Sequence, residues 1–84
     1  MIDERVRRIV GDHGKLTTDA SRLSTDADLY ELGLTSFATV QLMLALEEEF
    51  GVEMPDTLMN RRTFQSIGAM AGAMASLLPQ TASA

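Results

Sequence analysis

The 84-residue sequence contains no cysteine and no tryptophan, and it has a single histidine, His13. The absence of cysteine excludes disulfides, zinc–thiolate sites and a cysteine nucleophile. One histidine is too few for a histidine-based metal site, and we expect His13 to lie on the surface. No apolar run is long enough for a membrane span, and the N-terminus lacks a signal pattern. We therefore predict a cytoplasmic protein that does not bind membranes.

Positive charge is scarce, because 7 basic residues stand against 12 acidic ones and give a net charge of −5. The imbalance is concentrated in residues 19–56, where Arg22 is the only base among nine acids. Such a segment repels phosphates, which argues against nucleic acid as a partner and favours a protein with a basic patch. The alternative is that the acidic residues only keep a small domain in solution.

The hydrophobic pattern predicts helices throughout. Apolar residues recur at helical spacing and never alternate as in a strand, so we predict an all-α fold. The first half should form a helix from Ile2 to between Asp12 and Gly14, a loop over 16–28 and one helical turn at 29–32 behind Asp26 or Asp28. The second half should form a helix over Ser36–Phe50 ended by Gly51, a short helix within 56–62 capped by Asp56 or Thr57, and a helix over 64–78 capped by Thr63. We expect the three main helices and the short one to form a small up-down bundle over residues 1–78, with a disordered tail at 79–84.

Helix 36–50 carries more apolar surface than one core-facing side requires. At about 100° per residue, its apolar side chains form two stripes. The first stripe, which we assign to the core, consists of Leu42, Met43, Leu46 and Phe50. The second consists of Phe37, Val40 and Leu44, with Glu47 and Glu48 beside it. An exposed apolar stripe with an acidic margin is typical of a docking surface, and the alternative is a helix buried on two sides.

Two candidate N-caps, Thr35 and Ser36, precede this helix. If Thr35 is the cap, the Ser36 hydroxyl is free, and a phosphoryl group on it would lie at the positive end of the helix dipole. No base stands near Ser36 in the sequence, so a self-activated nucleophile is not indicated. Any modification of Ser36 would therefore be made by another enzyme.

The stretch DADLYELGLTSFATVQLMLALEEEFGVEMPD, residues 26–56, resembles the signature of acyl carrier proteins. The resemblance extends over residues 2–78 and implies an acyl-carrier fold without catalytic activity of its own. It also implies that a phosphopantetheinyl transferase attaches 4′-phosphopantetheine from coenzyme A to Ser36. The thiol of that group would hold a carboxylic acid as a thioester, which suits a chain without cysteine. Residues 1–78 would then be a monomeric carrier domain.

The runs LTSFATVQLMLALEEEF and PDTLMNRRTF look closest to stand-alone bacterial aminoacyl carrier proteins. This similarity implies loading with glycine or alanine by a ligase resembling the catalytic core of seryl-tRNA synthetases. The sequence departs from common carriers at Thr35, where those have aspartate, and at Ala38 and Gln41, where they place acids on the exposed side of the helix. The docking surface would therefore rely more on apolar contact than on charge. Its expected residues are Phe37, Val40, Leu44, Glu47, Glu48, Leu58, Arg61 and Arg62.

Two other interpretations fit the same residues. A carrier for fatty-acid, polyketide or nonribosomal peptide synthesis would share the prosthetic group and differ in its cargo. A helical protein-interaction module would have no prosthetic group, and Ser36 would then be only a helix cap.

Overall fold

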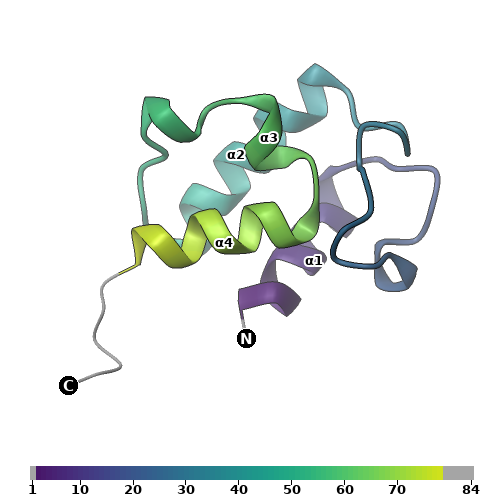
Figure 1. Cartoon of the computed structure of the whole chain (residues 1–84), viewed down its shortest axis with the longest axis horizontal. Coiled ribbons are helices and arrows are strands. Elements are labelled where there is room, and N and C mark those ends of the chain that lie inside the picture. Colours follow the sequence, from purple (N-terminus) through teal and green to yellow (C-terminus); the bar gives the residue numbers. More distant parts are fainter. Residues whose placement is uncertain (1, 79–84) are drawn as a thin grey trace.

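The computed structural model describes residues 2–78, so the tail predicted at 79–84 lies outside the described residues. Its elements are α1 (Ile2–His13), η1 (Ala20–Arg22), α2 (Ser36–Phe50), η2 (Asp56–Leu58), α3 (Arg61–Phe64) and α4 (Ile67–Leu77). The described residues are helical without strands, which confirms the predicted all-α bundle of three longer helices and a short one. The helix α1 packs against both α2 and α4, while α3 contacts α4 (Figure 1). None of these helices is both long and apolar enough to cross a membrane.

One stripe of each long helix builds a single core. The long helices contribute to it Val6, Ile9 and Val10 of α1, Ala38, Leu42, Leu46 and Phe50 of α2, and Ile67, Met70, Ala71, Ala73 and Met74 of α4. Leu77 and Leu78, at the end of the last helix, are half-buried and pack against this core. His13 ends α1 and is also half-buried rather than freely exposed.

The segment after α2 differs from the prediction. We expected one short helix capped by Asp56 or Thr57, but the chain forms the short 3-10 helix η2 and then a separate α3. Neither predicted residue is the cap of α3. Asn60 has that role, because its Oδ1 accepts a hydrogen bond from the backbone N–H of Thr63 at 3.0 Å.

The start of the last helix was also predicted wrongly. Phe64 ends α3 instead of beginning α4, and Thr63 is buried instead of acting as a cap. The cap of α4 is Ser66, whose Oγ accepts a hydrogen bond from the N–H of Ala69 at 3.0 Å. A long-range hydrogen bond fixes the break between the two helices, since the Gln65 carbonyl accepts from the N–H of Leu29 in the loop before α2.

The connection between α1 and α2 is long but anchored, and it lies at one end of the molecule (Figure 1). It contains η1, which we did not predict, and the Arg7 guanidinium donates to the Ala20 carbonyl at 2.8 Å and the Leu23 carbonyl at 2.6 Å. The expected turn follows Asp28, whose carboxylate accepts a hydrogen bond from the N–H of Tyr30 at 3.0 Å. This turn sets Tyr30 beside the start of α2.

Candidate functional site

Thr35 caps α2, and Ser36 is the first residue of the helix. The Thr35 Oγ1 accepts a hydrogen bond from the N–H of Ala38 at 3.0 Å. Ser36 is exposed, and no hydrogen bond within residues 2–78 engages its hydroxyl. The chain therefore presents one free hydroxyl at the positive end of a helix of 15 residues. A phosphoryl group attached there would be stabilised by the helix dipole.

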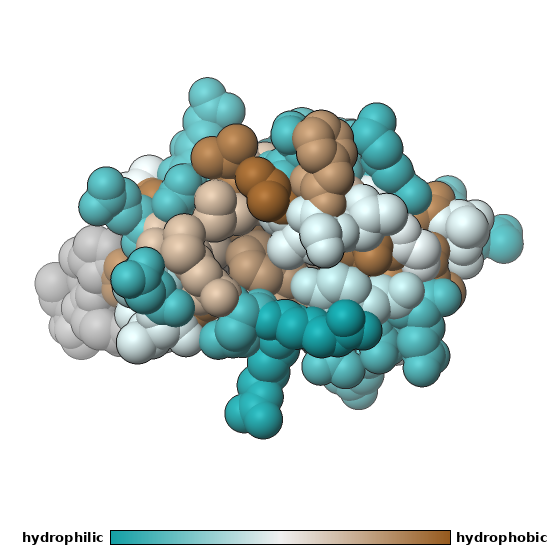
Figure 2. All heavy atoms as spheres, turned by 90° about the horizontal axis from the view of Figure 1, so that it is seen from above, coloured by the Kyte–Doolittle hydropathy of each residue, from teal (hydrophilic) through white to brown (hydrophobic). Residues whose placement is uncertain are grey.

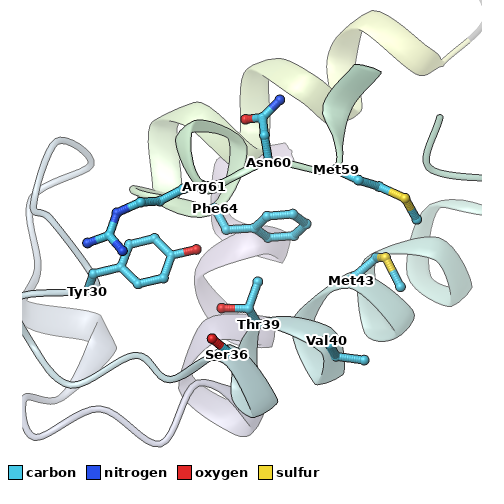
Figure 3. Close-up of a pocket in the computed structure, with 9 residues that line it drawn as sticks. All are labelled: Tyr30, Ser36, Thr39, Val40, Met43, Met59, Asn60, Arg61 and Phe64. Atoms are coloured by element: carbon cyan, nitrogen blue, oxygen red, sulfur yellow. The ribbon is translucent and has the colours of Figure 1, made fainter. Parts of the chain in front are cut away.

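A cavity of about 480 Å³ opens beside this hydroxyl (Figure 3). On one side it is lined by the α2 residues Ser36, Thr39, Val40 and Met43, and on the other by Tyr30, Met59, Asn60, Arg61 and Phe64. We assigned Met43 to the core, but it is only partly buried because it borders this cavity. A free hydroxyl next to a partly apolar cavity fits a prosthetic group that is covalently attached and has a long organic arm.

Arg61 and Arg62 were predicted together as docking residues, and the structure separates them. Arg61 lines the cavity, and its guanidinium carbon lies 4.0 Å from the centre of the Tyr30 ring. Arg62 is exposed and is not among the residues that line this cavity. The two neighbours therefore present their charges in different environments.

The second apolar stripe of α2 is exposed. The exposed fractions are 69% for Phe37, 48% for Val40 and 51% for Leu44, so the alternative of a helix buried on two sides is wrong. Met59, at 46%, is a further large exposed apolar residue that the sequence analysis missed, because it belongs to no helical repeat. Figure 2 looks onto the side of α3 and the start of α2, where apolar side chains gather across the middle of the surface.

Four further residues that were singled out from the sequence have defined positions in the structure. Ala38 is 2% exposed and belongs to the core, so its expected place on the exposed side of the helix is wrong. The carboxylate of Glu47 accepts a hydrogen bond from the N–H of Met54 at 2.8 Å and ties the segment after α2 to the helix. Leu58 is half-buried against the core, while Glu48 is exposed.

Residues 4–74 match the protein family described as the phosphopantetheine attachment site. The aminoacyl carrier protein of Agrobacterium fabrum is 49% identical to this chain over 65 residues, which make up 77% of this chain and 78% of the relative. Proteins of this kind are carriers and not catalysts.

Two crystal structures extend the likeness to the fold. A carrier protein from Agrobacterium tumefaciens, in complex with an engineered Bradyrhizobium japonicum glycine:carrier-protein ligase and ATP, is 42% identical with a TM-score of 0.87. The match covers 92% of this chain and 100% of that one. A glycylated carrier protein in complex with the Bradyrhizobium japonicum ligase is 26% identical with a TM-score of 0.72, covering 86% of this chain and 96% of that one.

Proposed function

Since this chain belongs to the family of carrier proteins that bear phosphopantetheine, we propose that Ser36 is the residue to which the prosthetic group is attached. The observation that carries this proposal is the exposed Ser36 hydroxyl, which is left free because Thr35 caps the helix. A separate transferase supplies the group from coenzyme A. In that step a bond forms between the Ser36 Oγ and the phosphorus that bears pantetheine. The pyrophosphate bond of coenzyme A breaks, the hydroxyl proton is released, and the adenosine bisphosphate part leaves.

The proposed cargo is a small amino acid, glycine first and alanine second. The curated relative is an aminoacyl carrier protein, and the two related carriers were crystallised with a glycine:carrier-protein ligase. When bound, the prosthetic group supplies the thiol that forms the thioester. The ligase activates the amino acid carboxylate with ATP as an adenylate and releases pyrophosphate; the thiol then takes the aminoacyl group, and AMP and the thiol proton leave.

The proposed docking surface for this ligase is the apolar stripe of Phe37, Val40 and Leu44, to which we now add Met59. Glu48 and Arg62 are exposed and carry charges of opposite sign. Apolar contact is not screened by salt, whereas exposed ion pairs are. Loading should therefore decline only modestly with added salt, and Gln41→Glu, a change toward acidic carriers, should not speed it.

Under this proposal the carrier domain of residues 1–78 works as a monomer in the cytoplasm. Coenzyme A is available there for attachment of the prosthetic group, and ATP for loading of the amino acid. Light scattering on the modified protein, alone and with the ligase, measures the oligomeric state. A stable dimer of the carrier alone would contradict this part of the proposal.

The cargo is tested by converting the protein to its modified form and offering it glycine, alanine, a bulky amino acid and a fatty acid with the matching ligases. Intact mass identifies the group that is loaded, and hydroxylamine, which cleaves thioesters, serves as the control. The proposal predicts gain and loss of a glycyl or alanyl mass. Loading by a fatty-acid enzyme alone would identify an acyl carrier instead.

A further inference from the structure

The cavity beside Ser36 has one charged residue in its lining, Arg61. Its guanidinium lies over the Tyr30 ring (Figure 3), and the backbone N–H of Tyr30 donates a hydrogen bond to the Asp28 carboxylate. Within residues 2–78, no carboxylate is paired with Arg61. Stacking on a ring holds a guanidinium in place and leaves the N–H groups at its edge free to donate. Arg61 is therefore a positioned cation that has no carboxylate partner in the described part of the chain.

Other polar groups of the cavity lining are already in use. The Asn60 side chain accepts from the N–H of Thr63 at 3.0 Å and donates to the Thr57 carbonyl at 2.9 Å. The Thr39 hydroxyl donates to the Thr35 carbonyl at 2.8 Å. Three polar groups of the lining have no hydrogen-bond partner within residues 2–78: the Arg61 guanidinium, the Tyr30 hydroxyl and the Ser36 hydroxyl. Once Ser36 is esterified, the Arg61 guanidinium and the Tyr30 hydroxyl are the donors that suit an anion next to it.

We propose that Arg61, held on the Tyr30 ring, binds the phosphodiester of the arm attached to Ser36 and directs the arm into the cavity. This inference rests on the proposed role of Ser36. The single negative charge of a phosphodiester matches the single cation of the lining, and arginine binds phosphate oxygens through paired N–H donors. Arg61 is a positioning residue and takes no part in the transfer or loading chemistry.

The cavity walls also suit the part of pantetheine that follows the phosphate. The geminal dimethyl group lies next to the phosphate end of the arm, and apolar side chains of Val40, Met43 and Phe64 line the cavity beyond Ser36. Figure 3 shows the Phe64 ring pointing into the space between α3 and α2. This apolar part of the lining suits the methyl groups that follow the phosphate.

The neighbouring Arg62 provides a matched control, because it is exposed and outside the cavity lining. The test uses the modified full chain as wild type, Arg61→Gln, Arg61→Lys and Arg62→Gln. Intact mass and peptide fragmentation first establish that each protein carries the group on Ser36. Isotope-filtered NMR then detects NOEs between the geminal methyl groups of the arm and the Phe64 ring, and relaxation reports the mobility of those methyl groups.

We expect these NOEs in wild type and Arg62→Gln, their loss with increased methyl mobility in Arg61→Gln, and partial retention in Arg61→Lys, which keeps the charge without the planar stack. Absence of the NOEs in wild type, or their persistence in Arg61→Gln, would overturn the positioning role while leaving Ser36 as the attachment site. Absence of the prosthetic mass on Ser36 in wild type would overturn the proposed function itself, and the inference with it.

Discussion

Arg5 on α1 holds Glu49 in the last turn of α2 through two groups of that residue. The Arg5 Nε donates to Glu49 Oε2 at 2.8 Å, and its Nη2 donates to the Glu49 carbonyl at 3.0 Å. Arg8 adds a bond to Glu49 Oε1 at 2.8 Å, and the Arg5 guanidinium lies 4.3 Å from the centre of the Phe50 ring. One cluster of side chains thus ties the first helix to the end of the second.

This cluster predicts a dependence of stability on pH. The hydrogen bond from Arg5 is the largest cause and lowers the pKa of Glu49; desolvation opposes it, and the charges of Arg8 and Arg5 add to the lowering. Because the folded pKa lies below the unfolded value of about 4.3, the contribution to stability is present above that value and is lost as the pH falls through the folded pKa.

Urea unfolding of wild type, Arg5→Gln, Glu49→Gln and the double variant measures the coupling between the two side chains. We expect a positive coupling at neutral pH that vanishes in acid. A coupling that is the same at both pH values would show that the carboxylate charge is not what joins the helices.

The two apolar stripes of α2 should respond differently to truncation. Leu46 is fully buried, so Leu46→Ala should lower the free energy of unfolding by about 2–5 kcal/mol through the cavity it leaves. Leu44 is 51% exposed, so Leu44→Ala should change stability by less than about 0.5 kcal/mol and slow loading by the ligase. Denaturant unfolding and the loading rate of both variants test this pair. Equal destabilisation would contradict the assignment of Leu44 to the surface.

The helix cap should be a property of Thr35 and not of Ser36. Thr35→Ala removes the oxygen that accepts from Ala38, which should cost about 1 kcal/mol. The same substitution at Ser36 removes no hydrogen bond within residues 2–78 and should leave the unfolding midpoint nearly unchanged. Urea midpoints of the two variants provide the comparison, and a larger loss at Ser36 would make that residue the structural cap.

Two glycines of α4 should behave in opposite ways. A Cβ at Gly72 would meet no atom within 4 Å, so Gly72→Ala should stabilise the helix by about 1 kcal/mol. A Cβ at Gly68 would lie 3.2 Å from the Thr25 carbonyl oxygen, which accepts the Gly68 N–H at 2.9 Å. Gly68→Ala should therefore gain less or lose stability, as thermal unfolding would show. A larger gain at Gly68 than at Gly72 would contradict the packing of α4 against the loop.

The sequence predicted α2 to the residue because both of its ends depend on local chemistry. Thr35 supplies the cap, and Gly51 ends the helix in the left-handed region at φ 64°. The start of α4 was not predictable in this way, since Thr63 and Ser66 are both suitable caps. The choice depends on a hydrogen bond at 2.8 Å from the N–H of Leu29 to the Gln65 carbonyl, which joins segments far apart in the chain.

The candidate site was predictable to a similar extent. The free Ser36 hydroxyl and the exposed stripe follow from caps and helical spacing, which are local. The cavity does not follow from local patterns. It forms because the turn before α2 brings Tyr30 to Arg61 and the packing of α3 places Phe64 opposite α2. This tertiary arrangement also separates the environments of Arg61 and Arg62 and places Met43 at the edge of the cavity, so neither could be predicted from helical spacing.

The most direct test of the carrier function is the intact mass of wild type and Ser36→Ala after incubation with coenzyme A and an active phosphopantetheinyl transferase. Circular dichroism shows beforehand that the variant is folded. The account predicts that wild type gains the mass of one phosphopantetheine group and that the folded variant gains none. Equal modification of the two proteins, or a wild type that keeps the mass of the bare chain, would contradict it.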